Sequence, residues 1–377
     1  MKIGFVLDDS LDKSDGVQQY ILTVASWMMT HGHEVHFLVG ETARRDLANV
    51  HSLGKNVKVK FNQNRMSIPL PARKSDIERV VTAEAFDILH VQMPYSPTLG
   101  AKVVNAAPSA TAVVGTFHIL PFSRWHHRAN RALGAVLKKN LKRFDGFISV
   151  SDAARKFAKA TYGFDSIVIP NTVETGRFAG AEPFPDESTK HIVFVGRLVE
   201  RKGCEYLLRA AHQLVADGLS DFVVDVCGRG ELEPRLKKYV DEHGLADKVR
   251  FHGFVTEEDK ARYLVSADVA VFPATGGESF GIVLIEAMAA GSKVVLGGDN
   301  PGYASVLRAE QLFSPRKTRQ LATKLASYLD DSPAGQVRSK EATDWQQHAV
   351  KQYDIDVVGR QLEDYYREAL LRRGDVR

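Results

Sequence analysis

Short apolar runs alternate with amphipathic stretches along most of the chain. In the first half, helical periodicity, as in residues 17–30 and 153–162, separates seven strand-like runs: KIGFVL, HEVHFLV, KVKF, DILHVQ, AVVGTFH, GFISVS and SIVIPN. A second series follows with HIVFVG, FVVDVCG, KVRFHGF, DVAVFPA and KVVLGG. Such alternation is typical of parallel sheets with helices on both faces. Two series predict an α/β protein with two doubly wound, Rossmann-like domains.

The stretch between the two series, residues 172–190, has glycines, prolines and acids but little periodicity. We therefore expect an N-terminal domain of residues 1–172 and a C-terminal domain of residues 173–352. The last stretch, 353–377, is amphipathic and helical, and no new strand precedes it. It can cap either domain or cross back to the first. With 377 residues, each half is long enough to bury a core of its own.

The composition is that of an ordinary globular protein, with 44% hydrophobic and 25% charged residues. Cys204 and Cys227 stand in apolar surroundings without metal-ligand spacing, which favours core residues in a reducing compartment. The N-terminal MKIGFVLDDS meets acids after a short apolar run, unlike a signal peptide. No apolar run approaches the ~20 residues of a membrane span. These features predict a cytoplasmic protein.

Positive charge is concentrated in the N-terminal part. Residues 1–172 hold 22 Lys and Arg against 14 Asp and Glu, and the remainder holds 28 against 32. Within Arg124–Arg143 there are seven basic residues, no acid, and apolar residues at helical spacing. This segment fits a helix on an anionic membrane surface, at the inner face of the cell membrane. It equally fits an ordinary helix with a solvated basic face.

A non-catalytic protein that binds nucleic acid or another anionic polymer is a further interpretation of the basic segment. Only Trp125 is available there for base stacking, and no nucleic-acid-binding motif occurs. We therefore expect no nucleic-acid partner.

In open parallel sheets ligands bind beyond the carboxyl ends of the strands, so the residues after each strand are the candidates. Four aspartates follow the first strand, but they lack the spacing and the terminal Glu of a calcium loop. We expect no metal there. Gly16, where this loop closes, is small enough for backbone to approach a phosphate at the next helix.

Two cations follow the strand HIVFVG, in RLVERKG. Arg197 and Lys202 flank a turn that ends at Gly203, where a helix begins. Cations beside a helix N-terminus can hold a diphosphate without a metal. Taken alone, the same pattern also fits a solvated surface turn. The following GRGELEPRL lacks the third glycine of a dinucleotide fingerprint, so an NAD site is not expected.

The segment GGESFGIVLIEAMAAG, 276–291, places Glu278 before a helix start and Glu286 inside an apolar helix. Free backbone N–H groups at Gly281, Ile282 and Val283 can bind an anion. The two carboxylates can accept hydrogen bonds from sugar hydroxyls and from a ribose diol. A carboxylate in an apolar helix is costly unless paired, so Glu286 requires a partner.

One histidine also ends a strand. His118 follows AVVGTF, and from that position it can donate to a reacting oxygen. A structural role is equally consistent with its position.

Taken together, these motifs resemble the retaining glycosyltransferases of the GT-B fold, the family-four type. The motifs with TFH, GVQ and GGESFGIV look most similar to bacterial phosphatidylinositol mannosyltransferases. The matching pieces cover nearly the whole chain: DGVQQY, FDILHVQ, GTFH, ISVSDAAR, IPNTV, VGRLVERKG, CGRGE, FHGFV, SADVAVFP and GGESFGIVLIEAMAAG.

The resemblance implies two Rossmann-like domains around a cleft, with the final helix returning to the first domain. It implies that Arg197 and Lys202 hold the donor diphosphate and that Glu278 contacts the sugar. Glu286 would bind the ribose and His118 would face the reacting centre. The remaining implied donor contacts are Gly16, Val255, Phe280, Gly281, Ile282 and Val283.

The implied reaction is transfer of a hexose with retention, without a protein nucleophile. The donor would be GDP-mannose and the acceptor a membrane lipid such as phosphatidylinositol; a UDP-sugar with a saccharide acceptor is the alternative. No cofactor is required, and Mg²⁺ is possible but not essential. A sugar-nucleotide epimerase of this architecture needs acid–base groups around the sugar, and no second cluster near Glu278 supplies them.

The chain departs from the family pattern in the acceptor region. Asp15-Gly16 stands where the mannosyltransferases often carry two glycines, and an aspartate beside a phosphate is unfavourable unless it turns away. FNQNRMSIP, 61–69, matches an inositol-phosphate loop only loosely. The expected acceptor contacts are Gln18, Asn62 and Arg65.

Overall fold

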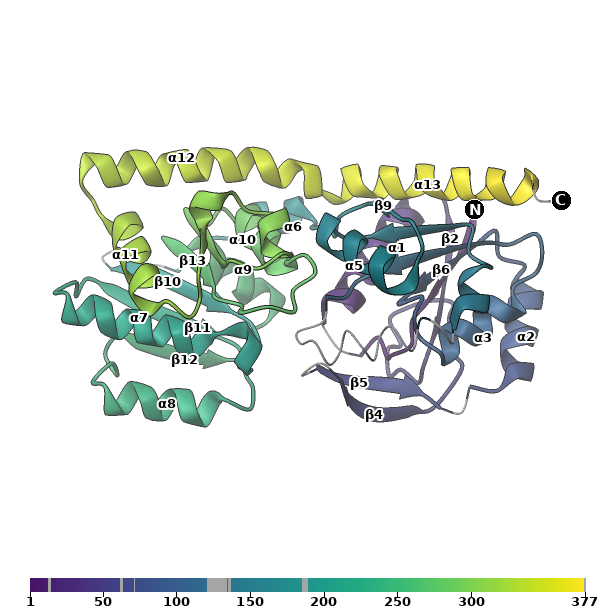
Figure 1. Ribbon diagram of the computed structural model, residues 1–377, viewed down its shortest axis with the longest axis horizontal. Coiled ribbons are helices and arrows are strands. Elements are labelled where there is room, and N and C mark those ends of the chain that lie inside the picture. The colour runs from purple at the N-terminus through teal and green to yellow at the C-terminus, as the bar shows by residue number, and fades with distance from the viewer. Residues whose placement is uncertain are drawn as a thin grey trace. The chain divides into compact units, whose positions relative to one another are not determined.

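A computed structural model describes residues 1–12, 15–61, 64–70, 72–120, 134, 137–184 and 189–375. The chain forms two compact units. The first comprises Met1–Thr172 together with Ile355–Arg377, and the second comprises Val173–Asp354. Each unit is a parallel sheet covered by helices (Figure 1).

The first unit contains a seven-stranded sheet in the order β3-β2-β1-β6-β7-β8-β9. Every neighbouring pair is parallel, and the order reverses direction between β1 and β6. The strands are β1 Lys2–Val6, β2 Glu34–Val39, β3 Val50–Ser52, β6 Ile88–Gln92, β7 Ala112–Phe117, β8 Gly146–Ser149 and β9 Ile167–Val168.

The predicted strand KVKF takes no part in this parallel sheet. It lies in β4, Asn56–Phe61, which pairs antiparallel with β5, Asn64–Pro69, as a separate hairpin. The third strand of the sheet is instead the short β3, which has too few residues for a periodic signal.

The final helix belongs to the first unit. α13, Ile355–Asp375, packs on α1, Gly16–Thr30, and on β7 (Figure 1). Trp27 Nε1 donates to Asp356 Oδ1 at 2.8 Å, and the hydroxyl of Tyr366 lies 2.6 Å from His90 Nδ1. These contacts attach α13 to the first unit near its start and near its middle. The other long helices of this unit are α2 Lys74–Glu84, α3 Leu99–Ala106 and α5 Asp152–Tyr162.

The second unit has a six-stranded sheet in the order β12-β11-β10-β13-β14-β15. All its neighbouring pairs are parallel, and the order reverses between β10 and β13. The strands are β10 Lys190–Val195, β11 Phe222–Cys227, β12 Val249–Gly253, β13 Val269–Phe272, β14 Val294–Gly298 and β15 Leu312–Phe313.

Local signals account for the helix boundaries of this unit. Thr256 caps α9 by accepting a hydrogen bond from the Asp259 N–H, and three acids occupy the first turn. Gly291, at φ +87°, ends α10 in the left-handed conformation that favours glycine. The helices are α6 Thr175–Ala179, α7 Cys204–Ala216, α8 Glu233–Glu242, α9 Glu257–Val265, α10 Ile282–Ala290, α11 Thr318–Leu329 and α12 Pro333–Ala349.

The two cysteines are buried thiols in the core of the second unit, as predicted. Burial raises the pKa of both Cys204 and Cys227 above the ordinary thiol value, so both are uncharged core residues. No helix among the described residues combines the length and the apolar character that crossing a membrane requires.

Candidate functional site

The site lies at the carboxyl edge of the second sheet, where the strand order reverses. β10 and β13 are hydrogen-bonded neighbours, with Ile192 opposite Val269 and Val193 opposite Ala270. Arg197 and Lys202 follow β10, and Glu278 follows β13. The topology therefore brings together residues about 80 positions apart at the place where open α/β sheets bind ligands.

The loops after β10 and β13 are held against each other by backbone contacts. The Thr275 N–H donates to the Arg201 carbonyl at 2.9 Å. Gly203 has φ +72°, and a Cβ at this position would lie 2.0 Å from the Pro273 carbonyl oxygen. Only glycine permits this turn and this approach, which explains the glycine in VERKG.

A buried carboxylate joins the two loops. Glu278 Oε1 lies 2.9 Å from Lys202 Nζ and 2.5 Å from Arg201 Nη1. The Glu278 side chain is 12% exposed and the Lys202 side chain 20% exposed. Both ion pairs use Oε1, so Oε2 can accept a hydrogen bond from a ligand hydroxyl without breaking either of them.

The charges at this cluster are tightly coupled. Burial acts to raise the pKa of Glu278, but Lys202 and Arg201 outweigh it and hold that pKa below its ordinary value. Burial lowers the pKa of Lys202, and Arg201 and Arg197 act in the same direction, while Glu278 opposes them. Two cations thus contact one carboxylate, and Arg197 lies close enough to act on the charge of Lys202, which leaves an excess of positive charge for an anionic ligand.

Sequence reasoning missed Arg201, which is buried and directly bonded to Glu278. It stands beside Lys202 in ERK, within the short 3₁₀ turn η1, Glu200–Lys202. The signal was the adjacent basic pair, but sequence periodicity does not tell which of two neighbouring cations turns inward in an irregular loop.

The helix after Glu278 begins as predicted. Gly281 is the N-cap of α10 at φ +115°, and a Cβ there would lie 2.6 Å from the ring of Tyr303. Phe280 is buried against Tyr353, whereas Ile282 and Val283 are partly exposed in the first turn. The Leu284 N–H donates to the Gly281 carbonyl at 3.0 Å, so the N–H groups of Ile282 and Val283 are the ones that could bind an anion at this helix start.

Glu286 has the partner that its burial demands. Lys260 on α9 donates to Glu286 Oε1 at 2.8 Å, and both side chains are at most 10% exposed. Lys260 also lies 2.7 Å from Glu257 Oε2. Burial would lower the pKa of Lys260, but Glu286 and Glu257 outweigh it and raise that pKa. Val255, partly exposed, lies in the turn between β12 and α9.

In the first unit His118 is buried at the end of β7. Its Nε2 lies 2.7 Å from Gln92 Oε1, and its ring packs edge-on against Tyr20. Burial lowers the pKa of His118 to about 3, so the imidazole is neutral at physiological pH. A neutral ring with Nε2–H donating to Gln92 presents Nδ1 as an acceptor. The expected donor role therefore requires this hydrogen bond to change.

The loop after β1 has structural contacts of its own. Asp8 is buried and accepts hydrogen bonds from Thr98 Oγ1 and from the Leu99 and Gly100 N–H groups, so it caps α3. Gln18 is also buried, with Nε2 donating to the Ser10 carbonyl at 3.2 Å. Gly16 is the exposed first residue of α1.

Several predicted residues fall outside the described structure. Asn62 lies outside the described residues, and Arg65 is described in its backbone only, within β5. Most of the basic segment Arg124–Arg143 also lies outside the described residues.

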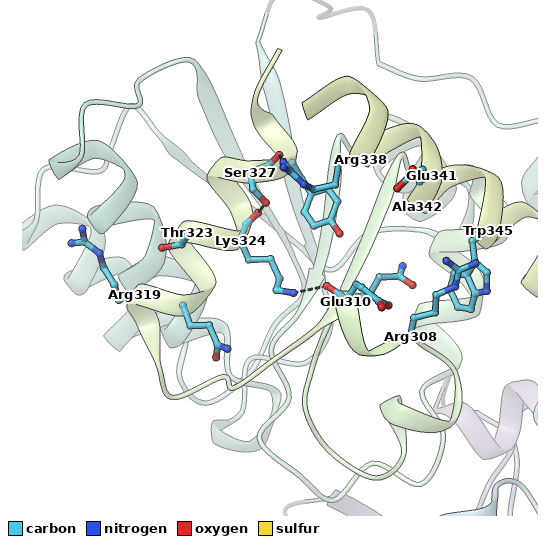
Figure 2. Close-up of a pocket in the computed structure, with 13 residues that line it drawn as sticks. Arg308, Glu310, Arg319, Thr323, Lys324, Ser327, Arg338, Glu341, Ala342 and Trp345 are labelled. Atoms are coloured by element: carbon cyan, nitrogen blue, oxygen red, sulfur yellow. Dashed lines mark hydrogen bonds between the residues drawn. The ribbon is translucent and has the colours of Figure 1, made fainter. Parts of the chain in front are cut away.

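A cavity of about 720 Å³ opens elsewhere in the second unit, between α11 and α12 (Figure 2). Its lining includes Lys324, which donates to the Glu310 carbonyl, and Arg308, which stacks on Trp345. None of the predicted donor residues lines it, so this cavity is separate from the cluster at β10 and β13.

Comparison with known proteins agrees with this geometry. Residues 14–177 match the family model Glycosyltransferase Family 4, and residues 180–351 match Glycosyl transferases group 1. The chain is 34% identical over 378 residues to a phosphatidyl-myo-inositol mannosyltransferase of Mycolicibacterium smegmatis, covering 97% of this chain and 93% of that one. The chain belongs to the GT-B glycosyltransferases of the family-four type.

A second relative has the same name as the first, and two solved structures share the fold of this glycosyltransferase. A phosphatidyl-myo-inositol mannosyltransferase of Mycobacterium tuberculosis is 32% identical over 375 residues, 97% of this chain and 96% of that one. A glycosyltransferase structure from Rickettsia africae ESF-5 matches with a TM-score of 0.77 at 18% identity, covering 98% of both chains. Anabaena Alr3699/HepE in complex with UDP and glucose matches with a TM-score of 0.73, also at 18% identity, covering 98% of this chain and all of that one.

Proposed function

We propose that this glycosyltransferase moves a mannosyl group from GDP-mannose to a phosphatidylinositol-type lipid, with retention of the anomeric configuration. The observation that carries the proposal is the pairing of Glu278 with Arg201 and Lys202, with Arg197 near Lys202, at the sheet's reversal point. It combines an excess of positive charge with one carboxylate, which matches a diphosphate attached to a hydroxyl-rich ring. The names of relatives that are 32–34% identical over 97% of this chain support the mannosyl donor and the lipid acceptor.

In the proposed donor complex the diphosphate lies between the cations and the first turn of α10. Lys202 and Arg197 contact its oxygens, as do the N–H groups of Ile282 and Val283. Negative charge on these oxygens grows as the bond to the sugar breaks. Donors already in place for that charge lower the barrier without further reorganisation.

Glu278 and Glu286 hold the two hydroxyl-bearing rings in this proposal. Glu278 Oε2 accepts from the sugar, while Oε1 stays on Lys202 and Arg201. Glu286 accepts from the ribose diol, and its ion pair with Lys260 holds the carboxylate in place. Val255 lies beside the base. With the sugar and ribose both fixed, the anomeric carbon is presented to the acceptor in one orientation.

Retention then follows from attack on the face that the diphosphate leaves. The acceptor hydroxyl approaches an oxocarbenium-like centre, and its proton passes to the departing phosphate oxygen. No carboxylate is required as a covalent nucleophile. Since protein cations supply the positive charge, we do not expect Mg²⁺ to be essential.

The acceptor would be taken up by the first unit, where we propose contacts from Gln18, Asn62 and Arg65. Because Gln18 is buried on Ser10, its contact requires the loop after β1 to adjust. We also propose that the basic segment Arg124–Arg143 binds anionic lipid at the inner face of the cell membrane. Vesicle flotation tests this: recovery should depend on anionic lipid, and equal recovery without it would remove the membrane contact.

The test of function is transfer by the purified full chain. GDP-mannose is supplied with vesicles containing phosphatidylinositol, and control vesicles contain phosphatidylglycerol, which has the same charge but no inositol. We expect mannosylated lipid from the first vesicles only, with the α-anomer of the donor kept in the product. Transfer only from a UDP-sugar to a saccharide would establish the alternative. Salt-dependent binding of anionic polymers without any transfer would contradict an enzymatic role.

A further inference from the structure

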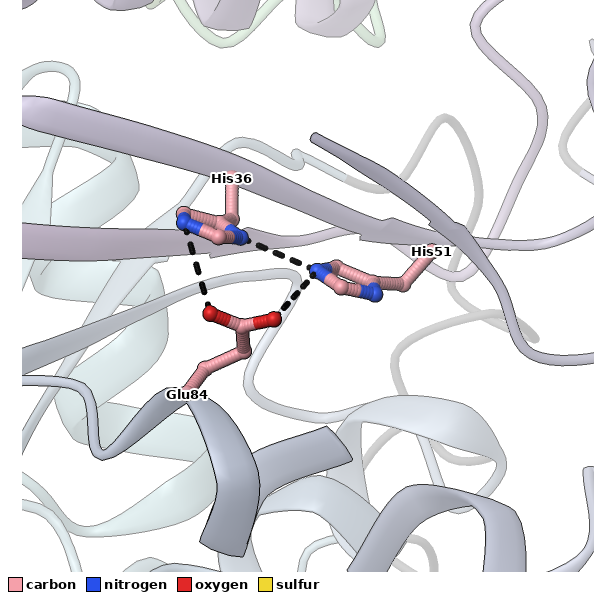
Figure 3. A group of neighbouring side chains, drawn as sticks. All are labelled: His36, His51 and Glu84. Atoms are coloured by element: carbon pink, nitrogen blue, oxygen red, sulfur yellow. Dashed lines mark hydrogen bonds and ion pairs between the residues drawn. The ribbon is translucent and has the colours of Figure 1, made fainter. Parts of the chain in front are cut away.

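We infer that the first unit carries a binding site for a divalent transition metal, formed by His36, His51 and Glu84 (Figure 3). The three residues come from β2, β3 and the last turn of α2. Their ligand atoms lie within 4.8 Å of one another. The site is independent of the proposed sugar transfer, because none of these residues belongs to the donor or acceptor set.

The distances fit a small coordination sphere. His36 Nδ1 lies 2.9 Å from His51 Nε2, and His51 Nε2 lies 3.9 Å from Glu84 Oε1. In a tetrahedral zinc site with bonds of about 2.0–2.1 Å, neighbouring ligand atoms are about 3.3 Å apart. Both distances are within roughly half an ångström of that separation. Rotation of the Glu84 side chain, which is 26% exposed, and slight parting of the two rings would complete the coordination sphere.

The surrounding residues orient the ligands in the way that metal sites require. Glu34 Oε1 lies 2.9 Å from His36 Nε2, which places the proton on Nε2 and directs the Nδ1 lone pair at His51. Lys2 Nζ lies 3.0 Å from Glu84 Oε2, which is also 3.7 Å from His36 Nε2, and Oε1 is the oxygen directed at His51. A carboxylate on the distal nitrogen of a ligating histidine is the usual arrangement around bound zinc.

Local charge also favours metal binding. Lys2 Nζ pairs with both Glu34 and Glu84, at 3.0 Å from each. The local carboxylates Glu34 and Glu84 exceed the single cation Lys2 by one charge, so a divalent ion is attracted.

The ligand set selects the class of ion. Two imidazoles and one carboxylate suit Zn²⁺ and its first-row neighbours, whereas Mg²⁺ prefers oxygen ligands. Because α2 ends at Glu84 just before β6 begins, the cluster lies near the amino-terminal edge of the sheet. Ligands of such sheets bind at the opposite, carboxyl-terminal edge. We therefore assign the ion a structural role in which it cross-links β2, β3 and α2.

The test uses tag-free full-length protein after treatment with a chelator. Adding Zn²⁺ should raise the Tm by about 5 °C or more at saturation, because binding to the native state stabilises it. Mg²⁺ should not. His51→Ala and Glu84→Gln should each lose the zinc-dependent rise. His33→Asn is the matched control, because His33 pairs with Glu363 at 3.0 Å in the same unit but outside the cluster.

Co²⁺ provides a second readout that does not depend on stability. The wild-type protein and His33→Asn should show the visible absorption of low-coordinate Co²⁺, and His51→Ala should not. A zinc response of equal size in all variants would place the binding elsewhere. The absence of both responses in the wild type would mean that His36, His51 and Glu84 form a hydrogen-bonded network only, and either result overturns the proposal.

Discussion

Lys202 Nζ lies 2.9 Å from Glu278 Oε1, although the two residues follow different strands and are 76 positions apart. Their contact spans the point at which the second sheet reverses its strand order. Both side chains are largely buried, so each charge depends mainly on protein groups of opposite charge. In the proposed donor complex Lys202 binds the diphosphate while Glu278 turns its second oxygen to the sugar.

We predict that Lys202→Ala lowers kcat/KM for transfer by roughly 10²–10³, the loss typical of one donor that stabilises developing charge. Lys340→Ala is the matched control, since Lys340 pairs with Asp344 on the surface of the same unit. Initial rates over a range of donor concentrations measure the effect. An equal kcat/KM for Lys202→Ala and the control would remove Lys202 from the donor site.

We predict that Lys260→Met raises the KM for the nucleotide-sugar more than it lowers kcat. Lys260 is 2.8 Å from Glu286 Oε1, and in the proposed donor complex it acts on the donor only through that carboxylate. Lys260→Met and Glu286→Gln should then disrupt the same interaction. The increase in donor KM in the double variant should therefore be smaller, in free energy, than the sum of the two single increases. Additive losses in KM would show that Lys260 does not position Glu286.

For His118 we predict that no ionisation of this residue appears in the pH–rate profile between about pH 5 and 8. Burial lowers the pKa of His118 to about 3, so it is neutral over that range. His118→Asn should lower kcat more than it raises the donor KM, and the shape of the profile should be unchanged. Loss of a titration near pH 6–7 in the variant would show that the imidazole ionises during the reaction.

A buried acid in the second unit makes stability dependent on pH. Asp225 on β11 accepts hydrogen bonds from His191 and His252 at 2.7 Å each. Burial would raise the pKa of Asp225, but the two histidines outweigh it and lower that pKa from 3.8 to about 2. Because the folded-state pKa is depressed, the stabilisation is present above pH 3.8 and is lost as the pH falls toward 2.

We therefore predict that the stability difference between wild type and Asp225→Asn shrinks by about 2 kcal/mol between pH 5 and pH 2. Urea unfolding at several pH values measures this difference. Asp344→Asn, at an exposed ion pair, should show no comparable change. A difference for Asp225→Asn that stays constant with pH would contradict the assigned pKa.

Periodicity was sufficient to predict the fold class. The runs HIVFVG and DVAVFPA carry β10 and β13, and the switch from alternating to helical spacing predicts the helices between them. KVKF was predicted as a strand of the parallel sheet, but it lies in the antiparallel hairpin of β4 and β5. The residues of so short a strand do not tell whether it pairs with a parallel or an antiparallel neighbour. Pairing direction depends on distant residues, which local pattern does not contain.

For the site, sequence reasoning could name candidate residues but not the pairs that they form. The cost of burying Glu286 implied a partner, but Lys260 is supplied by another helix and is invisible to spacing. The charge of the loop after β10 predicted an anion site, whereas the inward orientation of Arg201 depends on the 3₁₀ turn. The cluster of His36, His51 and Glu84 depends on the register between β2 and β3, so no sequence motif predicts it.

The central claim is that the Arg197 and Lys202 cations bind the donor diphosphate at the junction of β10 and β13. Titration calorimetry of GDP against the wild type, Arg197→Ala, Lys202→Ala and the surface control Lys340→Ala tests it at fixed ionic strength. We predict a Kd at least about tenfold weaker in each of the first two variants, with the control unchanged, since a charge-assisted contact is worth about 1.5–3 kcal/mol. A Kd for GDP that is the same in all four proteins would contradict the claim.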